Sequence, residues 1–135
     1  MGAIVRSDIF LVLLVLVVLE IKHYVFDYTL QSGYQYKNKG TYGHPGGIIH
    51  AGLQAFGTAL AFFVLTPPFW VGAAIVVVEF IIHYHTDWGK EQLNRRLNVE
   101  RGTAVYWALF GGDQLIHHLT YIVIAGVLSI YAFPA

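Results

Sequence analysis

The chain contains no cysteine among its 135 residues. Without cysteine there is no disulfide scaffold, no zinc finger, no thiol nucleophile and no cysteine-ligated iron–sulfur cluster. Charge is also scarce, because only 12% of the residues are Asp, Glu, Lys or Arg, against roughly a quarter in an average soluble domain. Eight basic residues balance eight acidic ones. We therefore expect no nucleic acid among the partners, since no excess of positive charge is present to attract it.

Apolar residues are abundant, at 56% of the chain, and they form long runs. Residues 9–19 read IFLVLLVLVVL, and a helix with no polar face belongs in a buried core or in lipid. Similar segments, each interrupted by a few polar residues, occupy 48–65, 69–82 and 104–133. About 20 helical residues cross a hydrocarbon core of ~30 Å. The alternative, a soluble helical bundle, would need more polar residues than this chain has to coat its surface.

We therefore predict an all-α polytopic membrane protein that forms a four-transmembrane-helix bundle with short loops. The whole chain, residues 1–135, is one domain, with helices at about 8–31, 46–66, 69–92 and 103–132. Glycines around Pro45 break the chain before the second helix, and Thr66-Pro67-Pro68 predicts a tight turn before the third. Asn98 or Thr103 is placed to cap the fourth.

The basic residues predict an orientation. Seven of the eight, all except Arg6, lie near the side of the membrane that the first helix reaches at its end. The positive-inside rule makes that side cytoplasmic. We therefore expect an integral membrane protein with both termini on the outer side, which is the periplasm if the membrane is a bacterial inner membrane.

Acids and histidines recur at helical spacing inside the predicted spans. Residues three or four apart share one face of a helix, within about 80° at ~100° per residue. The members are Glu20, His23, Asp27 and Gln31 on the first helix, His50 on the second, Glu79, His83, Asp87 and Lys90 on the third, and Asp113, Gln114 and His117 on the fourth. In an antiparallel bundle all four groups fall in the same half of the membrane. We therefore expect them to converge on one pocket.

Such groups are costly inside a membrane, at about 2.5 to 3.5 kcal/mol for an Asp at the helix centre, so they face the bundle interior or a wet cavity. Proton uptake or a divalent cation would relieve the excess of acids. Carboxylate and imidazole ligands suit zinc, iron or manganese, and the expected ligands are His23, Asp27, His50, Glu79, His83, Asp87 and His117. Lys90 is in register to pair with the acids, whereas Lys22 lies opposite Glu20 and is expected to extend to the membrane surface. A structural polar network that joins the helices is the alternative.

Three motifs resemble a known family. They are His23-x3-Asp27-x2-Leu30-Gln31, His83-x3-Asp87-x2-Lys90 and Asp113-Gln114-x2-His117. In order and spacing they resemble the small bacterial membrane proteins grouped as domain of unknown function 3307. The resemblance implies a polytopic inner-membrane protein and no established activity. Members often carry two histidines on the second helix, whereas here Gln54 stands four residues after His50.

The function expected from these residues is that of a metal-dependent membrane enzyme, hydrolase-like, on a lipid or other apolar substrate. Asp113 and Glu20 are the expected catalytic residues, and Lys90, Gln31 and Gln114 the expected substrate-binding residues. The expected partners are the lipid bilayer and either a second copy of the chain or a larger membrane complex. Two alternatives stay open: an accessory or structural subunit of such a complex, and a component of proton or metal-ion transport.

Overall fold

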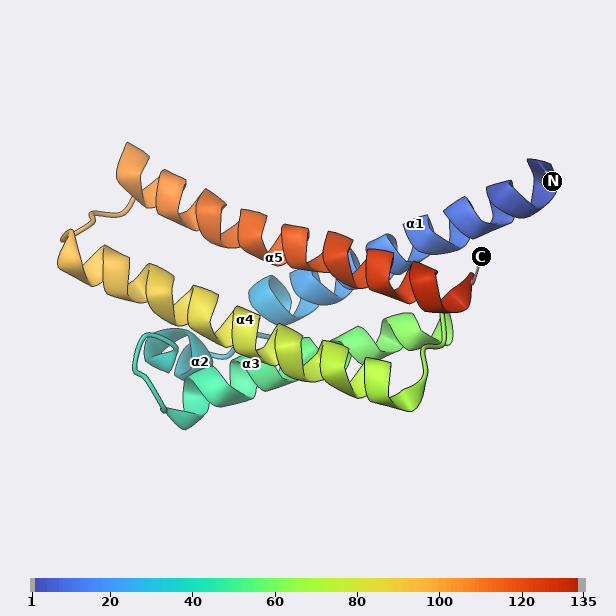
Figure 1. Ribbon diagram of the computed structural model, residues 1–135. Coiled ribbons are helices and arrows are strands. Elements are labelled where there is room, and N and C mark those ends of the chain that lie inside the picture. The colour runs from blue at the N-terminus through green and yellow to red at the C-terminus, as the bar shows by residue number, and fades with distance from the viewer. Residues whose placement is uncertain (1, 134–135) are drawn as a thin grey trace.

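The computed structural model describes residues 2–133, with side chains from residue 7 onward, and every regular element in that range is helical. The elements in Figure 1 are α1 (Gly2–Tyr24), a π-helix (Val25–Thr29), α2 (Gly33–Asn38), α3 (Pro45–Thr58), a 3-10 helix (Ala59–Phe63), α4 (Phe69–Arg96) and α5 (Ala104–Ala132). The predicted all-α class is confirmed.

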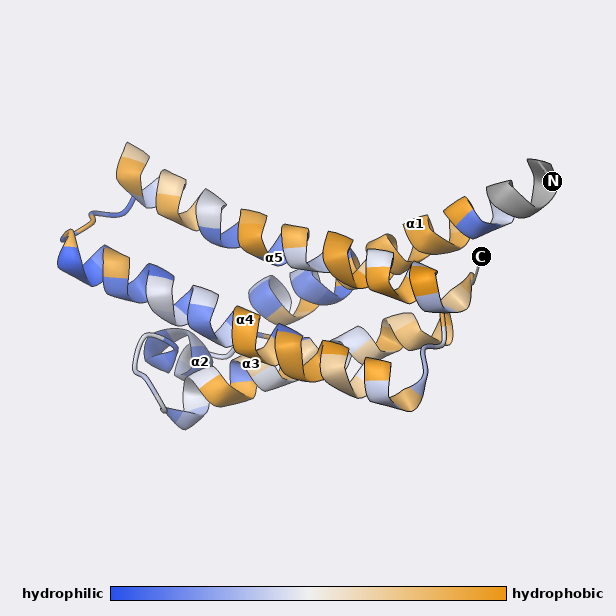
Figure 2. Cartoon of the chain, viewed as in Figure 1, coloured by the Kyte–Doolittle hydropathy of each residue, from blue (hydrophilic) through white to orange (hydrophobic). Residues whose placement is uncertain are grey.

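Four segments are long and apolar enough to cross a membrane: Ser7–Thr29, Pro45–Phe63, Phe69–Arg96 and Ala104–Ala132. Large apolar side chains cover their outer faces; Phe63 is 87% exposed and Phe69 is 91% exposed. Figure 2 shows the apolar colour concentrated on the half of the bundle that holds the start of α1 and the end of α5. Apolar exposure on this scale marks a membrane-facing surface. The chain is an integral membrane protein, as predicted.

The four long helices form a closed ring. Helix α1 packs against α3 and α5, and α4 packs against the same two helices on the other side. Successive long helices run in opposite directions, so α1 begins and α5 ends at the same end of the bundle (Figure 1). This topology brings the end of α1, the start of α3, the end of α4 and the start of α5 to the opposite end.

The helix ends follow from local chemistry. Pro45 occupies the first turn of α3, where its missing N–H costs nothing, and the His44 ring accepts a hydrogen bond from Gly46 N at 3.1 Å. The Thr103 hydroxyl caps α5 by accepting from Tyr106 N at 3.3 Å. Of the two capping residues considered for this helix, the structure uses Thr103.

Two local elements were not predicted from the sequence. Helix α2 lies where a loop was expected, and a capping box starts it: Ser32 Oγ accepts from Gln35 N, and the Gln35 side chain accepts from Ser32 N. The end of α1 winds into a π-helix, in which Leu30 N donates to Val25 O at 2.7 Å. Such π-turns are often found at functional sites, and this one carries Asp27.

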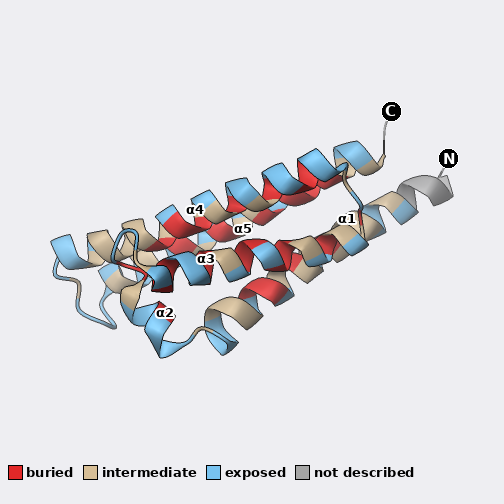
Figure 3. Cartoon of the chain, turned by 90° about the horizontal axis from the view of Figure 1, so that it is seen from below, coloured by how far each residue is buried: buried red, intermediate tan, exposed pale blue. Residues whose placement is uncertain are grey.

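The bundle interior has two halves. Between the chain ends and the middle, an apolar core holds Val15, Leu19, Ile75, Ile124 and Leu128, each less than a tenth exposed. Beyond the middle, the buried faces carry polar side chains instead, and Figure 3 shows buried positions lining the inner faces of the helices. The apolar half anchors the fold, so the polar half can hold groups that contribute little stability.

Helix α3 approaches α1 closely at Gly57, where a methyl group would lie 2.7 Å from Phe26 Cε2 and 3.3 Å from Lys22 Cδ. We expect Gly57→Ala to lower the free energy of unfolding by about 1–3 kcal/mol, because the neighbours must move. Gly52→Ala on the same helix is the control, since nothing lies within 4 Å of the added methyl there. Thermal unfolding followed by circular dichroism measures both, and equal midpoints for the two variants would contradict the close packing.

Candidate metal site

Four ligand atoms from three segments converge in the polar half. His50 Nε2 lies 2.9 Å from Asp27 Oδ1, 3.1 Å from Asp87 Oδ2 and 3.2 Å from His83 Nε2. His83 Nε2 lies 3.5 Å from Asp87 Oδ2 and 3.6 Å from Asp27 Oδ1. A tetrahedral zinc ion with bonds of about 2.0–2.2 Å separates its ligand atoms by roughly 3.3–3.5 Å. The contacts of His83 with Asp87 and Asp27, at 3.5 and 3.6 Å, match this separation, whereas the three contacts of His50, at 2.9–3.2 Å, are shorter. We call these four residues the nest.

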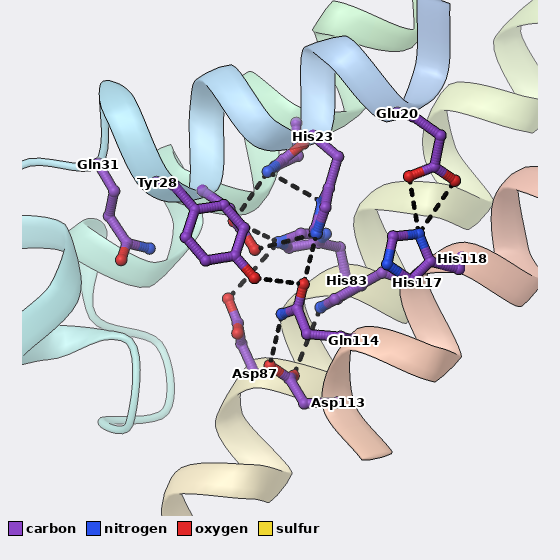
Figure 4. A network of polar contacts seen from close by, with 12 residues as sticks. Glu20, His23, Tyr28, Gln31, His83, Asp87, Asp113, Gln114, His117 and His118 are labelled. Carbon is purple, nitrogen blue, oxygen red and sulfur yellow. Dashed lines mark hydrogen bonds and ion pairs between the residues drawn. The ribbon is translucent and has the colours of Figure 1, made fainter. Parts of the chain in front are cut away.

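A second group of side chains on α5 adjoins this nest. The His117 ring stacks on the His83 ring with centroids 4.0 Å apart, and His117 Nε2 lies 3.4 Å from Asp113 Oδ1. Among the described residues, three sets have ligand atoms close enough to share an ion: Asp27, His83 and His117; His50, His83 and Asp87; and Asp87, Asp113 and His117. Every long helix therefore contributes, through α1's π-helical end, α3, α4 and α5 (Figure 4).

Several of these buried atoms form no hydrogen bond to any described residue, namely Asp87 Oδ2, Asp113 Oδ1 and His117 Nε2. Buried polar atoms normally find a partner, and leaving one unmatched costs about 1–3 kcal/mol. Here the nearest nitrogens and oxygens stand 3.1–3.5 Å away without hydrogen-bond geometry. Close approach without hydrogen bonding is the arrangement that ligands of a shared cation adopt.

Two lysines partly offset the acids. Lys39 Nζ donates to Asp87 Oδ1 at 3.0 Å, and Lys90 Nζ donates to Asp113 Oδ2 at 3.0 Å and lies 3.7 Å from Asp87 Oδ1. With Asp27 included, three carboxylates face two ammonium groups, which leaves one negative charge while the histidines are neutral. A buried uncompensated charge is costly, so this site favours the uptake of a cation.

The nest and the adjoining Asp113 and His117 together form the cluster. A polar cavity of about 330 Å³ opens beside it. The three residues expected to bind substrate, Gln31, Lys90 and Gln114, all border it. Tyr28 Oη donates to Gln114 Oε1 at 2.8 Å, which fixes one wall. Arg101, from the connection between α4 and α5, hydrogen-bonds to Tyr36 at the cavity rim. The cavity therefore lies at the end of the bundle away from the chain termini.

Two expected site residues lie beside the nest with partners of their own. His23 Nδ1 accepts from Tyr121 Oη at 2.9 Å, and His23 Nε2 lies 2.9 Å from Gln114 Oε1. Glu20 pairs with His118, with 2.8 Å between the carboxylate and the ring, and both side chains are more than two-fifths exposed. Figure 4 shows the Glu20–His118 pair to one side of the cluster. The three sets of potential metal ligands in the described chain include neither His23 nor Glu20.

The prediction that Lys22 extends to the membrane surface is wrong. Its side chain is buried, and Nζ forms an ion pair with Glu79 and donates to Gln54 O at 3.0 Å and to Tyr121 Oη at 3.2 Å. Glu79, expected as a metal ligand, is occupied by this lysine and belongs to none of the three sets among the described residues. The error arose from judging Lys22 by its angle to Glu20; its spacing from the buried Val15 and Leu19 indicates the core face.

Sequence reasoning missed two polar residues that hold the cluster. Gln54 Nε2 donates to Asp27 Oδ1 at 2.8 Å, so the residue that stands where a second histidine was expected orients a carboxylate instead. Lys39, the C-cap residue that directly follows α2, contacts Asp87 with its ammonium group. The capping-box pair Ser32 and Gln35 was the signal for that helix, and hence for the ordered position of Lys39.

The family model described as "Protein of unknown function (DUF3307)" matches residues 13–133, which is nearly the whole chain. No curated protein and no solved structure matches. The matched range contains all the residues of the cluster described above, and the chain belongs to the DUF3307 family.

Proposed function

We propose that this protein is a metal-dependent, hydrolase-type enzyme of the bacterial inner membrane that acts on a lipid or other apolar substrate. The observation that carries the proposal is the nest of four ligand atoms from Asp27, His50, His83 and Asp87, in which each of the two imidazole nitrogens lies 2.9–3.6 Å from the other and from both carboxylate oxygens. Two imidazoles and two carboxylates suit zinc, iron or manganese.

The four ligands differ in their access to the cavity. His50, His83 and Asp87 are at most 2% exposed, whereas Asp27 also borders the polar cavity. A catalytic metal site keeps a position that water or substrate can reach. Asp27 marks that position here, because it is the one of the four ligands that lines the polar cavity. The chemistry that a divalent ion supplies in such a place is a water nucleophile at neutral pH.

Asp113 is the general base of this proposal. It borders the cavity, Lys90 holds its Oδ2, and its Oδ1 is free of hydrogen bonds to the described residues. In hydrolysis the water oxygen bonds to the electrophilic centre of the substrate, one water proton passes to Asp113, and Asp113 returns that proton to the leaving oxygen as the bond to it breaks. Lys90, Gln31 and Gln114 hold the polar part of the substrate from the cavity wall.

The orientation follows from the charges. The cavity lies at the end of the bundle where seven of the eight basic residues fall, so it faces the cytoplasm and both termini face the periplasm. A transport function would need a polar path through the other half as well. Within the described residues that half is filled by Val15, Leu19, Ile124 and Leu128. A purely structural role would not need side chains spaced as metal ligands.

We expect the purified protein to carry about one equivalent of metal and His83→Ala to carry less than about 0.2, because one of four ligands is gone. His85→Ala is the matched control: His85 is exposed on the same helix and contacts Tyr42 and Ile81 outside the nest. Elemental mass spectrometry measures zinc, iron and manganese in each sample. A wild type without metal, or equal metal in His83→Ala and His85→Ala, would refute the proposal.

A further inference from the structure

The outer face between α4 and α5 carries an apolar groove of about 520 Å³. Its walls are formed by Trp70, Ile75 and Val78 of α4 and by Leu119, Val123 and Val127 of α5. The groove lies in segments that are long and apolar enough to span the membrane, so hydrocarbon surrounds it. It ends at Ile82 and Ile116, one residue before His83 and His117 of the polar cluster.

A second hollow continues along the same two helices. It has a volume of about 370 Å³, shares Ile116 with the apolar groove, and has Gly89 on one wall and Gly112 on the other. Lys90 and Asp113 border this hollow and also the polar cavity on the other side. Asp113 is 4% exposed, and its Oδ1 has no hydrogen-bond partner among the described residues. The two glycines therefore line a passage from the lipid side toward the cluster.

The apolar groove and the hollow that continues it form one track along α4 and α5. We propose that one membrane lipid docks along this track, with an acyl chain in the apolar groove and an anionic headgroup at Lys90. From Trp70 to Gly89 the track rises about 28 Å at 1.5 Å per residue, nearly the whole of a ~30 Å hydrocarbon core, so a lipid of one leaflet occupies the half nearest Lys90. An apolar channel that ends at a lysine matches an amphiphile with a negatively charged head. The inference rests on the proposed function and names its substrate class.

The preference for an anionic headgroup comes from the charge balance. In the cluster, Asp27, Asp87 and Asp113 face Lys39 and Lys90, which gives one net negative charge without metal and one net positive charge with a divalent ion. Glu91, whose Oε1 lies 3.7 Å from Lys90 Nζ at the cavity, adds one negative charge in both states. Lys90 keeps its hydrogen bond to Asp113 at 3.0 Å, but the metal compensates the charge of Asp87, so the ammonium group has a further N–H available to a phosphate. Metal binding and anionic lipid binding should therefore reinforce each other.

The glycines of α5 provide a matched pair of variants. A methyl group built on Gly112 or on Gly111 meets nothing within 4 Å, so both positions have space for the first carbon of a side chain. Gly112 lines the passage, whereas Gly111 borders none of the described cavities. Gly112→Leu thus fills the track, and Gly111→Leu adds the same bulk to the helix beside it.

Native mass spectrometry in detergent tests the inference with two probes that share their tails, dioleoyl phosphatidic acid and dioleoyl phosphatidylcholine. We expect zinc-loaded wild type to bind one phosphatidic acid about tenfold more tightly than phosphatidylcholine, a difference of about 1.4 kcal/mol. In the metal-stripped protein this preference should largely disappear. Gly112→Leu should lose about tenfold in affinity for both lipids, and Gly111→Leu should bind as wild type does.

Equal lipid binding by Gly112→Leu and Gly111→Leu would overturn the inference. So would a zinc-loaded protein with no preference between the two lipids, or a wild-type dimer that Gly112→Leu converts to a monomer without lipid, since the groove would then hold a second copy. Zinc and lipid add different masses, so a protein that takes no zinc is distinguished from one that takes zinc and no lipid. A protein that takes up neither zinc, iron nor manganese refutes the proposed function, whereas a protein that takes up zinc but no lipid refutes only the docked lipid.

Discussion

Asp113→Asn is expected to lower the rate of lipid hydrolysis by about 10²- to 10⁴-fold, the range for loss of a general base. The amide keeps the shape of the side chain but cannot accept the proton of the attacking water. The metal content should stay at about one equivalent, because the proposed ligands Asp27, His50, His83 and Asp87 are untouched. Mass spectrometry of a bacterial lipid extract measures the reaction, since hydrolysis gives two fragments whose masses sum to one lipid plus one water.

Glu91→Gln is the matched control for this substitution. Glu91 also borders the polar cavity and lies 3.7 Å from Lys90 Nζ, yet it belongs to none of the potential ligand sets in the described chain. We expect its rate to change by less than about threefold. If Asp113→Asn lost its metal together with its activity, Asp113 would be a ligand rather than the base. An unchanged rate would remove it from the reaction altogether.

Lys22→Met is expected to destabilise the protein by about 3–5 kcal/mol, because it leaves the Glu79 carboxylate buried without its counter-charge. Both side chains are 1% exposed, and Lys22 also fixes Gln54 O and Tyr121 Oη. The groups around the ion pair come from α1, α3, α4 and α5, so the loss should loosen the whole bundle. Denaturant titration in detergent micelles, followed by tryptophan fluorescence, measures the free energy of unfolding.

The double variant Lys22→Met with Glu79→Gln separates charge from packing. Removing the stranded carboxylate should restore more than half of the lost stability, since an ion pair replaced as a whole costs little. Lys37→Met provides the control, because Lys37 is exposed and its replacement should leave the unfolding midpoint nearly unchanged. A wild-type-like midpoint in Lys22→Met would show that the pair contributes nothing to folding.

The sequence was sufficient to predict the helical architecture and to predict which half of the bundle holds most residues of the cluster. Long apolar runs predict spanning helices, and in an antiparallel bundle the alternation of direction determines which ends meet. That reasoning placed His50, His83, Asp87 and His117 in one half of the membrane, and the structure brings their side chains together. The spacing of Asp27 from His23 on the first helix predicted that Asp27 lies in the same half, although the π-helix that carries it was not predicted.

The remaining details depend on angles and partners that spacing alone does not determine. A stripe within about 80° is wide enough for one end to face a neighbouring helix and the other to face lipid. Glu20 therefore lies at the edge with His118, while Lys22, assigned to the outside, points inward at Glu79. The position of Lys39 depends on α2, a six-residue helix whose stability comes from its cap rather than from any periodic apolar pattern.

The apolar packing of Val15, Leu19, Ile124 and Leu128 closes the interior of the bundle at one end, so the polar pocket is accessible from one side of the membrane only. It seals the polar pocket from the compartment that contains the chain ends, so anything water-soluble that reaches the histidines and acids comes from the opposite compartment. Under the proposed function, supply of an ion, delivery of protons and release of a soluble product would all depend on that single aqueous compartment. Changes in its composition would reach the pocket directly, whereas the far compartment could influence it only through the lipid.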